Sequence, residues 1–150
     1  MRAWLRGGLL FLLLVETVVG AWQYFAPRSF FTHFPTVALD PPFNEHLMSD
    51  VGGLTLAITA VVAYAAGHLE YRLVSGALIG YIVFAVTHVL FHATHLDGFG
   101  AADAVEVVTV LAVSAVIPIA LLVLARRIDQ AERDLRVTPG ESAVSRSAAG

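Results

Sequence analysis

The stretch that decides the fold is residues 73–96, LVSGALIGYIVFAVTHVLFHATHL, which is apolar almost throughout. A helix needs about 20 mostly apolar residues to span a bilayer, so this stretch is long enough to cross a membrane. Three histidines interrupt it near its end, at the i, i+4, i+7 spacing that places side chains on one face of a helix: His88, His92 and His95. The stretch therefore predicts a membrane helix with an imidazole-rich face.

The composition of the whole chain also indicates a membrane protein. Of its 150 residues, 57% are hydrophobic and 14% are charged, whereas a soluble domain has about 45–50% apolar and about 25% charged residues. The chain has no cysteine, which excludes disulfides, thiolate ligands and thiol redox chemistry. It has no lysine either, so a side-chain Schiff base is excluded. The formal net charge of −3 argues against nucleic acid as a partner.

Four stretches are long and apolar enough to span the bilayer, so the sequence predicts an all-α, polytopic membrane four-helix bundle. The expected spans are residues 4–25, 47–66, 73–95 and 104–125. Residues 1–127 are expected to form the transmembrane domain. Residues 128–150 are expected to be a charged helical extension that becomes disordered from Val137 onward.

The arginines predict the orientation of the spans. Eight of the nine arginines fall on one side of the four predicted spans, and only Arg28 falls in a loop on the other side. Since positive residues concentrate on the cytoplasmic side, both termini are expected to be cytoplasmic in a multi-pass protein of the plasma (inner) membrane. The alternative for the first span is a cleaved signal peptide, against which Glu16 in its apolar core argues.

The connections carry helix-breaking and capping signals. Residues 26–44 hold four prolines, so this segment is expected to interrupt the helices, with its phenylalanines at the level of the lipid headgroups. Asn44 or Asp40 is expected to cap the second span, and Gly67 suits its end.

Small residues are expected to let the helices approach closely. They are Gly52 and Gly53 in the second span, and Gly76 and Gly80 in the third. The Gly76-x-x-x-Gly80 motif fits either an internal packing face or a dimer face.

Polar side chains of all four spans fall at similar depths below the outer surface. A deeper layer, roughly 10–13 Å down at about 1.5 Å per residue, holds Glu16 and His88. A middle layer, roughly 4–8 Å down, holds His92, Asp50 and Glu106. The other candidates lie nearer the surface: Glu45, His46, His95 and Asp103. Together they predict one outward-facing His/carboxylate pocket to which every span contributes.

The leading hypothesis is that this pocket binds a metal ion or a small ligand. Imidazole and carboxylate together suit zinc, iron or copper. The predicted metal ligands are His88, His92, Asp50 and Glu106. A haem held between His46 and His92 is a weaker alternative. No His-Glu-x-x-His motif is present, so the sequence names no reaction and leaves open whether the chain is an enzyme.

Two other interpretations stay open. Histidines beside acids can relay protons, which suits a redox-associated membrane subunit that handles quinone or protons. Alternatively, the cluster is a buried polar network in a structural or accessory subunit, working as a homo-oligomer or with a membrane partner protein. For Glu16, a deep partnership with His88 and a neutral buried acid are equally supported. Tyr81 is expected to pack in the core.

Several short segments resemble the broad DoxX-like group of small, uncharacterised four-helix bacterial membrane proteins. They are Phe34-Pro35, FNEHL at residues 43–47, DVGG at residues 50–53 and HVLFHATH at residues 88–95. The resemblance covers most of residues 1–127 and implies a four-helix membrane fold. It also implies a link to quinone or thiol redox chemistry, of which the absence of cysteine disfavours the thiol role. It transfers no catalytic residue.

Overall fold

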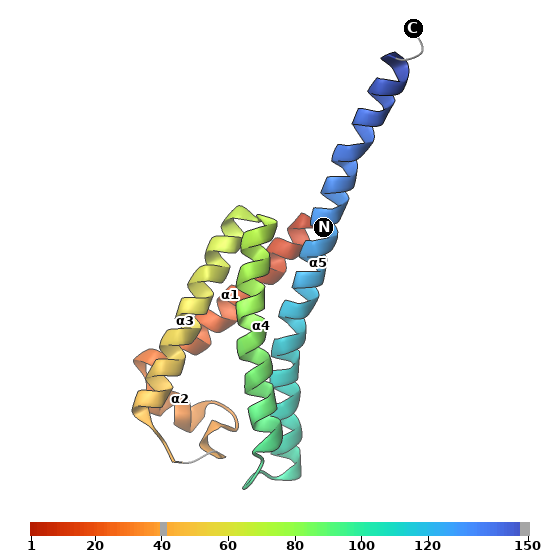
Figure 1. Cartoon of the computed structure of the whole chain (residues 1–150). Coiled ribbons are helices and arrows are strands. Elements are labelled where there is room, and N and C mark those ends of the chain that lie inside the picture. Colours follow the sequence, from red (N-terminus) through yellow and green to blue (C-terminus); the bar gives the residue numbers. More distant parts are fainter. Residues whose placement is uncertain (40–41, 148–150) are drawn as a thin grey trace.

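Helices make up almost all of the part of the chain that the computed structural model describes, residues 1–39 and 42–147. The elements, labelled in Figure 1, are α1 (Arg2–Phe25), α2 (Pro27–His33), the short 3-10 helix η1 (Val37–Leu39), α3 (Glu45–His68), α4 (Tyr71–Thr94) and α5 (Ala101–Ser147). Helices α1, α3, α4 and α5 are each long and apolar enough to cross a membrane. The predicted all-α class with four membrane-length helices is thus confirmed.

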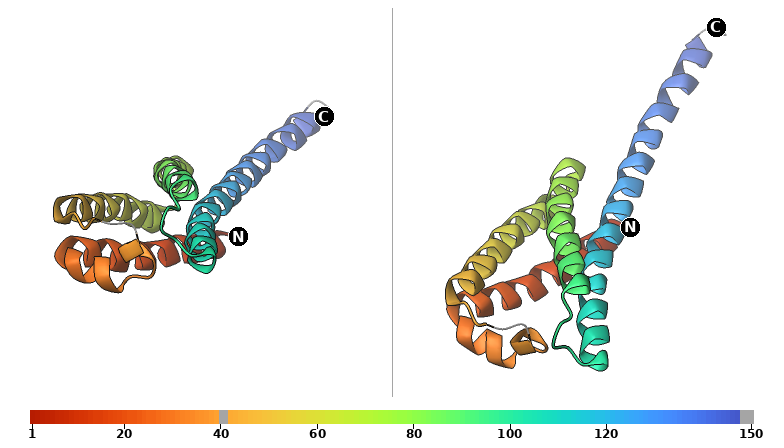
Figure 2. Two further views of the ribbon diagram at one scale, coloured as in Figure 1. Left: turned by 90° about the horizontal axis from the view of Figure 1, so that it is seen from below. Right: turned by 60° about the horizontal axis from the view of Figure 1, so that its bottom comes forward.

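The four long helices form two pairs that diverge. α1 packs mainly against α3, and α4 packs mainly against α5. α3 and α4 lie close together at their short connection, Leu69–Glu70, and separate away from it, while α1 crosses the bundle obliquely (Figures 1 and 2). We call the end with Met1 and Leu69–Glu70 the inner end. The opposite end, with α2, η1 and the α4–α5 loop, is the outer end.

Glycines bring the backbones of α1 and α3 into direct contact. A Cβ atom added to Gly52 would lie 2.6 Å from the backbone nitrogen of Tyr24, and one added to Gly20 would lie 2.9 Å from Cγ2 of Thr55. Real Cβ contacts do not reach such distances, so only glycine fits this crossing. The close approach expected at Gly52 is therefore confirmed.

The glycine motif of α4 makes no such contact. A Cβ atom added to Gly76 or to Gly80 would meet no described atom within 4 Å. Of the two interpretations of this motif, internal packing is therefore wrong for the described part of the chain. The reason is that a helix contact needs a facing partner, and none of the described helices lies against this face.

The outside of the bundle, like its inside, carries many apolar side chains. Leu9, Val62, Val74, Leu78 and Pro118 are fully buried between the helices. Large apolar side chains also point away from the bundle on every long helix: Leu14, Leu54, Val83 and Val116 are each more than half exposed. An extensive exposed apolar surface is typical of a surface that contacts lipid or another protein.

The ends of α3 differ in how well the sequence predicts them. Asn44 caps the start as expected, because its side-chain Oδ1 accepts a hydrogen bond of 3.0 Å from the backbone N–H of Leu47. The alternative cap, Asp40, lies outside the described residues. The helix ends one residue beyond Gly67, at His68, and Leu69 takes the left-handed conformation with φ of 51°.

Two further boundaries differ from expectation. Residues 27–33 of the proline-rich connection form the helix α2, because Pro27 occupies the first turn, where its missing N–H has no partner to lose. α5 continues without a break past Val137 to Ser147, so no helix boundary coincides with the expected onset of disorder. Disorder of the tail stays a prediction.

Candidate functional site

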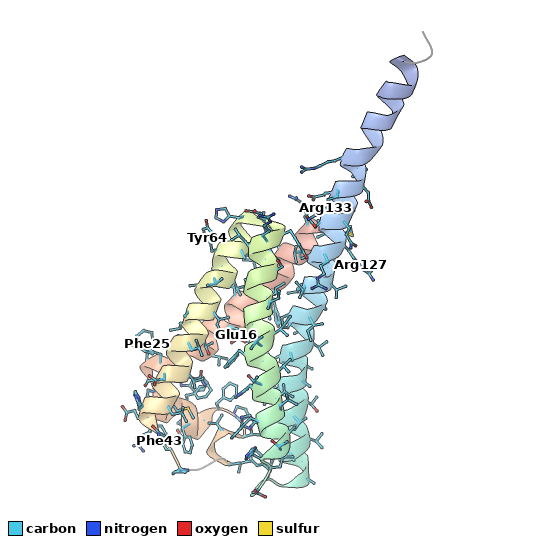
Figure 3. All side chains as sticks on the ribbon, in the orientation of Figure 1. Glu16, Phe25, Phe43, Tyr64, Arg127 and Arg133 are labelled. Carbon is cyan, nitrogen blue, oxygen red and sulfur yellow. The ribbon has the colours of Figure 1, made fainter. Side chains whose placement is uncertain are left out.

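A part-buried polar contact joins α1 to α4. The Tyr81 hydroxyl donates a hydrogen bond to Oε1 of Glu16. Tyr81 is only 3% exposed and belongs to the apolar core, and Glu16 is half-buried midway along the bundle (Figure 3). Leu12, Thr59 and Val62 surround the pair, so three helices enclose this carboxyl group.

This partner of Glu16 was not predicted. Equal residue counts give equal depths only if helices run parallel, but α1 crosses the bundle obliquely, and Glu16 lies midway along the bundle (Figure 3). Glu16 therefore contacts Tyr81, two helical turns before His88. A signal was present in the sequence, because Tyr81 and His88 are seven residues apart and share one helix face.

Two histidines continue this face of α4 toward the outer end. The rings of His88 and His92 meet edge to face, with 4.7 Å between their centroids. The Phe84 ring stacks on His88 at 5.6 Å, between the histidine pair and Tyr81. Both histidines are half-buried. We call Glu16, Tyr81, His88 and His92 the polar column.

His95 ends the histidine run outside this column. Its ring stacks on Phe91 at 4.2 Å, and its Nδ1 lies 2.9 Å from the carbonyl oxygen of Phe91. The side chain is exposed. His95 thus makes its contacts with the preceding turn of α4, at Phe91, and not with the other histidines.

His46 and Asp50 form a separate pair at the outer end of α3. Nε2 of His46 lies 3.3 Å from Oδ2 of Asp50, one helical turn away, as their spacing predicts. Their side chains are 88% and 64% exposed. Because α3 diverges from α4 toward this end, the pair is exposed and does not join the polar column.

The remaining carboxylates lie apart from the histidines. Glu45 begins α3 and is exposed, Glu106 of α5 is exposed, and Asp103 is half-buried in the first turn of α5. In the described part of the chain, no three His, Cys, Asp or Glu side chains lie close enough together to hold one metal ion. The predicted four-ligand set of His88, His92, Asp50 and Glu106 is therefore not assembled, and metal binding stays a prediction.

The sequence does not predict that the aromatic segment at the outer end, from α2 to η1, is folded and packs against the bundle. The indole N–H of Trp22 donates to Oγ of Ser29 at 3.2 Å, and its ring packs edge-on against Phe30 at 5.5 Å. The carbonyl oxygen of Leu39 lies 3.9 Å from an ideal Cβ position on Gly98 in the α4–α5 loop. The segment from α2 to η1 thus extends from the α1–α3 pair to the α4–α5 pair.

The geometry supports proton chemistry better than multidentate coordination. A carboxyl group, a phenol and two imidazoles follow one another from the bundle centre toward the outer end, and each of these groups can accept and donate protons. Comparisons with known proteins add no assignment: no family model, curated protein or solved structure matches the chain.

Proposed function

We propose that this chain is an integral membrane protein that handles protons through the polar column. In the proposed orientation, both termini are cytoplasmic and the outer end faces away from the cytoplasm. This orientation is supported by the arginines, since Arg28 alone of the nine falls in the segment between α1 and α3 at the outer end. Figure 1 shows Met1 at the same end of the bundle as the extension of α5.

The observation that carries the proposal is the hydrogen bond between Glu16 and Tyr81. Placing a charged side chain at the centre of a membrane helix costs about 3 kcal/mol. An uncharged hydroxyl or amide would join α1 and α4 at a lower cost. A carboxyl group in this position therefore supports a role that needs its acid–base chemistry.

The histidines give the carboxyl group a route to the outer end. Each imidazole has one ring nitrogen that can donate a proton and one that can accept a proton, so it can pass a proton between neighbouring groups. His92 is one helical turn from His88, and Tyr81 lies about 10 Å along the helix axis below His88. The Phe84 ring stacks on His88 in the interval between His88 and Tyr81, so in this proposal water beside that ring carries the proton across the interval.

The test is proton flux into vesicles that contain the purified protein and a trapped pH-sensitive dye. Wild-type protein should dissipate an imposed pH gradient faster than protein-free vesicles, once a potassium ionophore clamps the potential. Glu16→Gln should abolish this flux because the amide cannot release a proton, and His92→Ala should slow it. The variant His33→Ala, at the exposed end of α2 and outside the polar column, is the control and should match wild type. Wild-type flux equal to that of protein-free vesicles would contradict the proposal.

Metal binding by His88 and His92 is the second candidate. Their 4.7 Å ring separation and i, i+4 spacing suit two ligands of one zinc, iron or copper ion, with the other ligands from water or a second molecule. Elemental analysis of detergent-purified protein should then find metal that His92→Ala abolishes. The exposed His68→Ala is the control. Metal-free wild-type protein with proton flux would favour the first candidate.

The resemblance to DoxX-like proteins supports a third candidate, a redox role. Because the chain has no cysteine, that role would involve a quinone and not a thiol. A quinone takes up protons when it is reduced, so the polar column would supply them. A quinone-dependent absorbance change that Glu16→Gln removes would support this role. Co-purification with a fixed partner, without flux, metal or quinone response, would support an accessory subunit instead.

A further inference from the structure

A separate cavity opens at the inner end of the bundle, far from the polar column. Its volume is about 310 Å³, and it lies between the start of α1, the start of α4 and the part of α5 around Glu132. Leu5 and Val74, both in the apolar core, form part of its wall. The cavity thus combines an apolar side with a strongly polar rim.

Arginines dominate the rim. Four of them, from three different helices, line the cavity: Arg2, Arg72, Arg133 and Arg136. Three carboxylates also line it, so the formal charge of the lining is +1: Glu70, Asp129 and Glu132. Guanidinium groups present paired N–H donors that match the oxygens of a phosphate group.

Two of the four arginines form ion pairs with carboxylates of the cavity rim. Arg2 pairs with Glu132 at 2.7 Å, and Arg133 pairs with Asp129 at 2.9 Å. Arg72 and Arg136 form no ion pair with any other described residue. These two cations, one on α4 and one on α5, therefore keep their charge for a ligand.

We propose that this cavity binds a phosphate-bearing anion, and that its source is the headgroup of an anionic phospholipid. The apolar wall continues into helices of membrane length, whereas the arginines lie at their ends, which is the level where lipid phosphates lie. The volume is at the lower limit of small-molecule pockets, which suits a headgroup better than a whole lipid. The inference rests on the membrane-spanning arrangement and not on proton handling.

The experiment titrates the detergent-purified full chain with phosphatidylglycerol or phosphatidylcholine and counts bound lipid by native mass spectrometry. Phosphatidylglycerol should bind at least about tenfold more tightly, because only its headgroup carries a net negative charge. Arg72→Gln and Arg136→Gln should each weaken its binding about fivefold. Arg72→Lys keeps the charge but lacks the paired donors, so it should weaken binding less than Arg72→Gln.

Arg127→Gln is the matched control. It removes the same charge from an exposed position of α5 that does not line the cavity (Figure 3), so it should leave binding unchanged. Equal losses in Arg127→Gln and Arg136→Gln would overturn the proposal, since they would indicate general attraction between charges. Equal binding of the two lipids would also overturn it. Inorganic phosphate that binds in the same titration as tightly as phosphatidylglycerol would overturn the lipid as the source.

Discussion

α1 contacts α3 and α4 in two different ways. Against α3, the backbones touch at Gly20 and Gly52, where an added methyl group has no room. Against α4, a single side-chain hydrogen bond joins Glu16 to Tyr81. The first contact depends on shape and the second on chemistry. Substitutions at the first should therefore prevent correct packing, whereas substitutions at the second should alter function at a smaller cost in stability.

The largest effect is expected from Gly52→Ala. The new Cβ would lie 2.6 Å from the Tyr24 backbone nitrogen, so α1 and α3 must move apart. We expect a loss of at least about 3 kcal/mol in the free energy of unfolding, measured by denaturation in detergent. Gly53→Ala is the matched control, because its Cβ would make only ordinary contacts of 3.6 Å with the Tyr24 ring. Equal stability of the two variants would contradict the close crossing.

Gly20→Ala should cost less, about 1–3 kcal/mol. Its new Cβ would lie 2.9 Å from a methyl carbon of Thr55, and a side chain can move where a backbone cannot. Thr55→Ser removes that methyl group and should recover part of the loss in the double variant. Recovery should be incomplete because the carbonyl oxygen of Gly52 stays 3.2 Å away. Strictly additive effects in the double-mutant cycle would mean that the two residues do not contact.

Tyr81→Phe tests the chemical contact. Loss of the hydroxyl leaves Glu16 without its hydrogen-bond donor, and we expect a cost of about 0.5–2 kcal/mol together with reduced proton flux. Tyr64→Phe is the control, since Tyr64 is 58% exposed on α3. A variant that keeps full stability and full flux would show that this hydrogen bond serves neither purpose.

The smallest effect is expected from Gly80→Ala. The new Cβ would meet nothing within 4 Å, so stability should stay unchanged or rise by up to about 1 kcal/mol through better helix propensity. The same unfolding measurement applies. A clear loss of stability would contradict an open face and would indicate that another chain packs on the glycines of α4.

Local features of the molecule could be predicted from the sequence, and most long-range ones could not. The four long helices, the Asn44 cap and the His46–Asp50 pair each depend on spacing within one segment, and all three are present. The predicted His/carboxylate pocket requires all four helices to converge at one end. That convergence depends on how the helices tilt, and the spacing of residues within one helix carries no information about tilt. α3 diverges from α4, and in the part of the chain that the structure describes Asp50 pairs with His46 of its own helix and joins no group of three possible metal ligands.

The contact between Glu16 and Tyr81 was missed for the same reason. The sequence singles out both residues, but a count of residues from the outer end predicts equal depth only for parallel helices. The oblique course of α1 breaks that relation. The glycine contact shows a related limit, because Gly20 and Gly52 belong to different helices and form no motif within either one.

Because α5 is long, a small rotation of this helix moves its C-terminal end over a large distance. Its 47 residues extend over about 70 Å, more than twice the roughly 30 Å of a bilayer's hydrocarbon core. Because α5 packs against α4, a small change of tilt around the polar column would become a much larger displacement at the far end of the helix. A spectroscopic label on the exposed Leu135 would therefore report movement that occurs around the polar column.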